Sequence, residues 1–133
     1  MVRGTRCAAR DERGSSTVTV VLLLPVLLLA MTGVVQYAFW YHAHHVALAA
    51  AQEGARAARV LDGTAAAGEA RARWMLDQLG RGLVQDLTIT VERDGDRARA
   101  EVRGYAPQWL PGIRLPIEAA ASGEIETFRS DGT

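Results

Sequence analysis

The architecture of the chain follows from the stretch Arg13-Gly-Ser-Ser-Thr-Val-Thr-Val-Val-Leu-Leu-Leu-Pro25-Val-Leu-Leu-Leu-Ala30, where a charged arm meets a long apolar run. No Asp, Glu, Lys or Arg follows Arg13 until Glu53. A helix from Ser15 to Tyr41 is roughly 40 Å long at about 1.5 Å per residue, enough to cross a hydrocarbon layer of about 30 Å. The sequence therefore predicts a membrane-inserted helix, bent at Pro25 because proline lacks a backbone donor.

Composition narrows the functional classes. The 133 residues carry fifteen arginines, no lysine and fifteen acids, so the formal net charge is zero and there is no basic field of the kind that binds nucleic acid. Cys7 is the only cysteine, which excludes an intrachain disulfide and a thiolate zinc site. No nucleophile elbow, phosphate loop or zinc motif occurs. We therefore expect no enzyme, no cofactor and no small-molecule substrate.

The flanking arginines predict orientation. Four arginines precede the apolar run, whereas Arg56 and Arg59 follow it beyond Glu53. Positive residues stay on the cytoplasmic side, so we expect a single-pass protein of the bacterial cytoplasmic membrane, with its N-terminus inside and about ninety residues outside. A signal peptide cleaved near Ala30 is the alternative. The run continues to an aromatic cluster at residues 37–41, which fits an interfacial belt and favours an anchor.

The predicted organisation has three parts. Residues 1–14 form a charged leader, residues 15–61 one extended helix, and residues 62–133 a small α+β domain outside the membrane. Asp62-Gly-Thr64 breaks the first helix, and an amphipathic second helix is expected from Thr64 to Gly80. Small residues recur along one side of the first helix, at Ala43, Ala47, Ala50, Gly54 and Ala58. They either reflect alanine richness alone or let another helix approach closely.

Alternating residues predict a small antiparallel sheet of about three strands. Leu87, Ile89 and Val91 alternate with polar residues, and Asp94-Gly95 is a strong hairpin turn signal. A two-residue loop at Asp94-Gly95 places Val91 opposite Ala98. A third strand is expected from about 117 to 128, with acids that face the arginines of the second strand: Glu118, Glu124 and Glu126 opposite Arg97, Arg99 and Arg103. So few strands need a helix or a partner subunit for stability.

Two further clusters have a functional and a structural interpretation. His42, His44 and His45 could hold a metal ion, but imidazoles beside an aromatic cluster also fit the wet edge of a bilayer, which we favour. Residues 107–116 form a proline-punctuated loop that carries Trp109. We expect its apolar side chains to pack on the sheet or on the helix around Trp74, the alternative being an exposed contact for a partner or a membrane.

The junction at Gly14, taken with the run to Leu29 and with Gly33 and Gln36, resembles the N-terminal signature of the TadE-like family over residues ~13–55. These proteins are pseudopilins of tight-adherence pilus systems. The resemblance implies that a prepilin peptidase cuts after Gly14 and leaves Ser15 as the new N-terminus. Family members usually carry glutamate at the fifth mature position, followed by an aromatic residue. Here Thr19 and Val20 stand there, so charge-registered polymerisation is not implied, although the Thr19 hydroxyl can bond to the Ser15 carbonyl.

The resemblance implies a membrane-anchored minor pilin or pilus-assembly component of a tight-adherence, type IV-like pilus or secretion system. The implied partners are other TadE-like or pilin subunits, the prepilin peptidase, platform proteins and a secretion ATPase. Two alternatives stay open from the residues alone. One is a small binding domain secreted after signal-peptidase cleavage, and the other is a signal-anchored envelope sensor that uses the three histidines.

Overall fold

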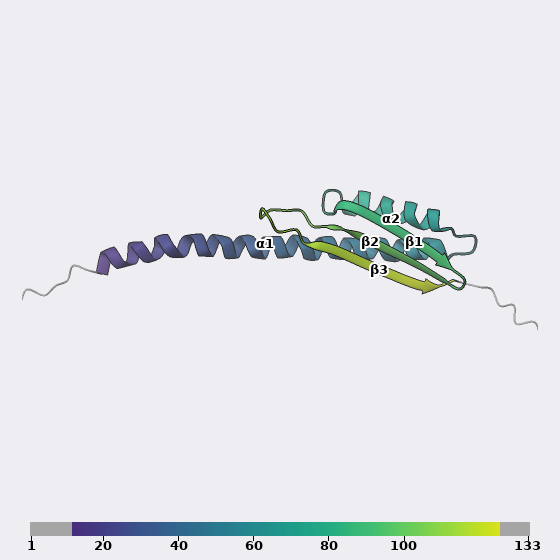
Figure 1. The fold of residues 1–133 in the computed structure, drawn as a ribbon, viewed down its shortest axis with the longest axis horizontal. Coiled ribbons are helices and arrows are strands. Elements are labelled where there is room, and N and C mark those ends of the chain that lie inside the picture. Colours follow the sequence, from purple (N-terminus) through teal and green to yellow (C-terminus); the bar gives the residue numbers. More distant parts are fainter. Residues whose placement is uncertain (1–11, 126–133) are drawn as a thin grey trace, which may run out of the picture. The chain divides into compact units, whose positions relative to one another are not determined.

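The computed structural model describes residues 12–125, with side chains from Thr17 onward, and has the predicted α+β arrangement. Five elements follow one another along the chain (Figure 1). They are α1 (Glu12–Arg59), α2 (Ala65–Leu79), β1 (Gln85–Asp94), β2 (Arg97–Tyr105) and β3 (Pro116–Glu124). The chain divides into two compact units, and the boundary falls between Val35 and Gln36, inside α1.

Helix α1 has 48 residues and continues through Pro25. Proline at this position leaves the carbonyl four residues earlier without its helical donor. A few residues later the Thr32 hydroxyl donates to the Leu28 carbonyl oxygen at 2.8 Å, so this polar side chain is satisfied within its own helix. The helix ends at a turn in which Asp62 has a φ of 65°. A side chain at Gly63 would place its Cβ 2.7 Å from two backbone oxygens of α1, so this turn requires glycine.

Helix α2 is capped as the sequence predicts. The Thr64 hydroxyl accepts from the amide of Ala67 at 3.0 Å, and the amide of Gly80 donates to the Leu76 carbonyl oxygen at 2.7 Å. The buried face of α2 consists of Gly68, Ala72 and Leu76, spaced four residues apart. Leu79, the last residue of α2, is exposed despite its apolar side chain.

The sheet is antiparallel in the order β1-β2-β3, and the predicted hairpin register is wrong by two residues. Asp94 pairs with Arg97, so the loop is Gly95-Asp96, and Val91 lies opposite Ala100. Gly95 has a φ of 50° at the first turn position, as a type II′ turn requires. A loop moved by one residue shifts the pairing by two, so each side chain stays on its predicted face.

The predicted charge match between β2 and β3 is confirmed at Arg103, whose Nη2 lies 3.0 Å from the Glu118 Oε1. Arg97 pairs with Glu124 in the register, and Glu126 lies outside the described residues. β3 ends at Glu124, earlier than the predicted end near residue 128. Glu101 also bonds to Arg103, and this hydrogen bond is the main reason why the pKa of the Glu101 carboxyl is lowered.

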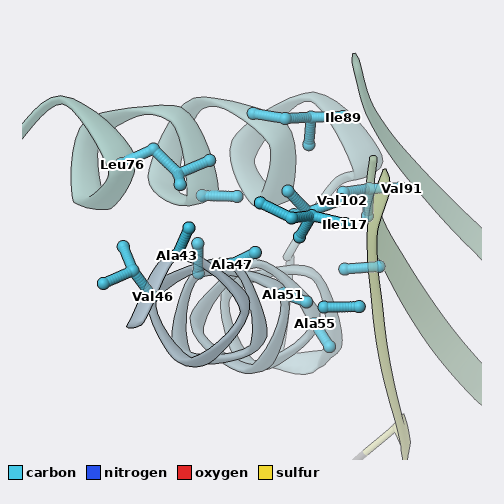
Figure 2. Close-up of a cluster of buried hydrophobic side chains, with 14 of the residues drawn as sticks. Ala43, Val46, Ala47, Ala51, Ala55, Leu76, Ile89, Val91, Val102 and Ile117 are labelled. Atoms are coloured by element: carbon cyan, nitrogen blue, oxygen red, sulfur yellow. The ribbon is translucent and has the colours of Figure 1, made fainter. Parts of the chain in front are cut away.

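Helices α1 and α2 cover one face of the sheet, and the core lies between them and the strands (Figure 2). The strands contribute Ile89, Val91, Val102 and Ile117, whereas α1 contributes mainly alanines. Helix α2 approaches α1 closely, since a Cβ on Gly68 would lie 2.7 Å from the Gly54 carbonyl oxygen. Glycine and alanine at this crossing leave room for the two backbones.

The small-residue stripe of α1 is therefore covered by its own chain. Ala43, Ala47, Ala50 and Ala58 are fully buried, and a Cβ on Gly54 would meet Ala72 Cβ and the Gly68 carbonyl oxygen at 3.0 Å. The close-approach interpretation is right, but the partner is α2 and the sheet of the same domain. In the folded domain this stripe is therefore buried and is not exposed at the surface.

Candidate functional site

The first candidate region is the apolar segment of α1. Within residues 12–125, α1 is the one helix whose length and composition allow it to cross a membrane. Its apolar side chains from Val18 to Met31 are exposed and none of the most apolar window is buried. Exposed aliphatic side chains in such number need an apolar environment, because each would otherwise contact water. This N-terminal apolar helix indicates membrane anchoring.

The sequence-predicted processing residues lie at the start of this helix. Gly14 and Ser15 fall in its first turn, and their side chains are outside those that the structure describes. Thr19 and Pro25 follow on the same helix, within the exposed apolar segment. The charged arm with Cys7 precedes the described residues. Cleavage after Gly14 thus stays a prediction.

The second candidate region is the loop between β2 and β3, residues 106–115, which we call the proline loop. Gln36 on α1 is only 4% exposed and is the buried polar side chain of the described core. Its Nε2 donates to the Pro107 carbonyl oxygen at 3.0 Å, and its Oε1 accepts from the Trp109 amide at 3.1 Å. One side-chain amide therefore satisfies a backbone acceptor and a backbone donor of the loop, as a neighbouring strand would.

Aromatic side chains add to this attachment. The Trp40 indole donates to the Pro116 carbonyl oxygen at 2.9 Å, and the ring of Trp109 stacks on Phe39 with 5.6 Å between centroids. The proline loop is thus held at both ends by residues 36–40 of α1. Trp109 nevertheless stays 62% exposed and Ile113 47% exposed.

This position corrects our prediction for Trp109. We expected packing on the sheet or near Trp74, but the loop lies on α1, and Trp74 is exposed beneath the Arg71 guanidinium at 4.4 Å. Leu115 does pack against the core. Proline fixes the loop direction only locally, so its point of attachment depends on Gln36, seventy-one residues earlier in the sequence.

The three histidines lie on α1 among aromatic rings. His44 stacks on Trp40 with 5.7 Å between centroids, and His45 meets Tyr41 edge-on at 4.4 Å. His42 and His45 are exposed, whereas His44 is half-buried and its Nδ1 has no hydrogen-bond partner. Over residues 12–125, no group of three His, Cys, Asp or Glu side chains is arranged to hold a metal ion. His44 and His45 thus contact rings of the aromatic cluster beside which they stand in the sequence.

Sequence reasoning missed the structural role of Gln36. Its signal was present, because Gln36 is an uncharged polar residue inside an otherwise apolar run of helix. A buried amide needs hydrogen-bond partners, and a proline loop has backbone groups that need them as well. The sequence gives no indication that these two segments meet.

Comparison with known proteins gave a match that includes the apolar segment of α1. A family model described as TadE-like protein matches residues 14–56. Comparison with curated proteins and with solved structures gave no match. The matched range begins at the glycine of the charged-to-apolar junction and ends near the end of α1. Residues 14–56 are accordingly a TadE-like segment, as the resemblance of their sequence predicts.

Proposed function

We propose that this chain is a minor pilin or pilus-assembly component of a tight-adherence, type IV-like pilus or secretion system. The observation that carries the proposal is the TadE-like match at residues 14–56, which includes both the junction at Gly14 and the apolar part of α1. The exposed apolar side chains of that part support storage of the subunit in the bilayer. In this proposal the chain crosses the cytoplasmic membrane once, with the N-terminus inside and the α+β domain outside.

The proposed partners are other TadE-like or pilin subunits, a prepilin peptidase, platform proteins and a secretion ATPase. The small-residue stripe is buried in the domain outside the membrane, and contacts between subunits in the bilayer would involve the exposed side chains between Val18 and Val35. Thr19 at the fifth mature position offers no carboxylate to a neighbouring N-terminal ammonium. An accessory role in assembly therefore fits this chain better than that of a bulk filament subunit.

N-terminal sequencing of the membrane-bound protein tests the proposal. Expression with the prepilin peptidase should yield Ser15 as the first residue, and expression without it should leave Met1 in place. A Gly14→Val variant is the matched control, because a branched side chain at the scissile position should block the cut while the apolar segment is unchanged. An uncut chain in the presence of the peptidase would refute processing at this junction.

A second candidate function keeps support from one observation. The compact unit that holds the core begins at Gln36, so a chain cleaved near Ala30 would retain the complete α+β domain as a secreted binding domain. The same sequencing experiment separates the two candidates, because secretion predicts a soluble product that starts near Met31. The third alternative, an envelope sensor using the histidines, gains no metal-binding geometry from the described residues.

A further inference from the structure

The proline loop and the adjoining turns of α1 expose aromatic and apolar side chains. Trp109 and Ile113 are exposed on the loop, and Tyr37 and Tyr41 are exposed on the helix. Tyr37 stacks on Tyr41 with 6.2 Å between centroids, and Trp109 stacks on Phe39. Tyr37 and Tyr41 project from the side of α1 opposite to Phe39, because residues two apart on an α-helix differ by about 200°. The exposed residues Tyr37, Tyr41, Trp109 and Ile113 therefore surround this part of the helix, and we call them the aromatic surface.

The aromatic surface has no formal charge of its own. Residues 36–52 of α1 contain no Asp, Glu, Lys or Arg, and neither do residues 106–113 of the loop. The first charge after them, Arg114, is paired with Asp86 and covers the ring of Tyr105 at 4.1 Å. The outer face of the sheet differs, since it carries the ion pairs of Glu101, Arg103 and Glu118. Uncharged and charged surfaces are therefore segregated within the domain.

Several backbone groups of the loop are hydrogen-bonded within the domain. Gln36 satisfies the Pro107 carbonyl and the Trp109 amide, and the Ala106 amide donates to the Leu115 carbonyl oxygen at 3.0 Å. Proline at position 111 has no amide to satisfy. Pairing of these groups lowers the cost at which this part of the loop enters a less polar medium.

The helix rise places the aromatic surface at the level of the lipid headgroups. Residues 18–35 extend about 27 Å at about 1.5 Å per residue, close to the hydrocarbon thickness of about 30 Å. Residues 36–41 then occupy the next roughly 9 Å of the helix, where tryptophan and tyrosine are enriched in membrane proteins. Trp109 shares this level because its ring stacks on Phe39.

We propose that the aromatic surface is a second membrane contact, in which Trp109 and Ile113 of the proline loop insert into the headgroup region of the lipid beside the helix. This inference rests on the membrane anchoring of the proposed function. Lipid is the occupant that fits a charge-free surface whose helix residues follow the apolar span directly in the sequence. The loop would thereby fix the rotation and tilt of the domain at the membrane, a constraint that a single helix alone does not provide.

Bromine-labelled lipid tests the proposal on the full chain in phosphatidylcholine vesicles. A Trp40→Phe, Trp74→Phe variant keeps Trp109 as its one tryptophan, and a Trp40→Phe, Trp109→Phe variant keeps Trp74, which is also exposed, at 49%. Lipid brominated near the headgroup end of its acyl chains should quench about half of the Trp109 emission and leave Trp74 emission unchanged. If brominated lipid quenched the same fraction of tryptophan emission in both variants, the loop insertion would be overturned.

A second measurement leaves the tryptophans in place. In a Cys7→Ser background, Ile113→Cys and Asp94→Cys are compared for labelling by a charged maleimide, Asp94 being exposed at the hairpin. Insertion predicts labelling of Ile113→Cys about tenfold slower than that of Asp94→Cys in vesicles, because a charged reagent is excluded from lipid. Slow labelling without bromolipid quenching would indicate contact with a second copy of the chain and would overturn the lipid proposal.

Vesicle flotation separates this inference from the proposed function. A chain that does not float with the vesicles has no lipid anchor, and both proposals then fail. A chain that floats, with Trp109 emission unquenched, keeps the anchor and loses only the loop contact. A chain that floats with Trp109 quenched supports both.

Discussion

Substitution of Gly68 by alanine tests the close crossing of α1 and α2 on which the domain depends. The new Cβ would lie 2.7 Å from the Gly54 carbonyl oxygen, 2.9 Å from Val91 Cγ1 and 3.1 Å from Ala58 Cβ. The oxygen belongs to the backbone of α1 and cannot rotate away, so the two helices must move apart. The alanine-rich core would then lose contacts along the whole crossing.

Two opposing effects set the magnitude. Overpacking of a well-packed core costs about 1–3 kcal/mol. Alanine in place of glycine within a helix contributes about 1 kcal/mol in the favourable direction. Since a backbone oxygen is the nearest contact, we place the cost in the upper part of its range and expect a net loss of about 1–2 kcal/mol in the free energy of unfolding of the domain.

Hydrogen exchange of the β2 amides in the detergent-solubilised chain is the suitable assay, because it reports opening of the domain separately from the apolar segment. The expected loss corresponds to exchange about 5–30 times faster. Ala70→Gly is the control, since Ala70 is exposed on α2 and its replacement changes helix propensity alone, by about 1 kcal/mol. Exchange in Gly68→Ala that is slower than in the unsubstituted chain would show that propensity dominates and that the crossing is looser than described.

Three other predictions concern polar groups. Gln36→Ala should cost about 1–3 kcal/mol by leaving buried loop groups unpaired, with faster exchange at the Trp109 amide, and an unchanged Trp109 amide would contradict this. Arg103 lowers the pKa of the Glu101 carboxyl in the folded domain. The ionised carboxylate therefore stabilises the fold fully above the ordinary pKa of 4.5, and this stabilisation is lost as pH falls through the lowered folded value. A Glu101→Gln variant should show a weaker acid dependence in thermal unfolding between pH 5 and pH 2, roughly the window of such a titration. Glu53→Gln removes a solvent-screened ion pair and should change the unfolding free energy by less than about 1 kcal/mol, measured by the same exchange assay.

Local signals were sufficient for the elements and for the faces of the strands. Thr64 and Gly80 cap α2 because a hydroxyl and a terminal glycine act on neighbouring backbone groups. The alternation of Ile89 and Val91 put the correct side chains in the core even though the turn was placed one residue too early. Side-chain period two preserves the face when the register moves by two.

Some features of the candidate site were also predictable from local sequence, and others depended on the tertiary structure. The sequence by itself determined the apolar segment and its charged-to-apolar junction at Gly14, because hydrophobicity and charge act without a tertiary partner. Only the tertiary structure decided that Gln36 binds the proline loop, and that the stripe from Ala43 to Ala58 is filled by α2 and the sheet. Both depend on contacts between residues far apart in the chain, and no local pattern encodes which distant surface has the complementary shape and hydrogen-bonding groups.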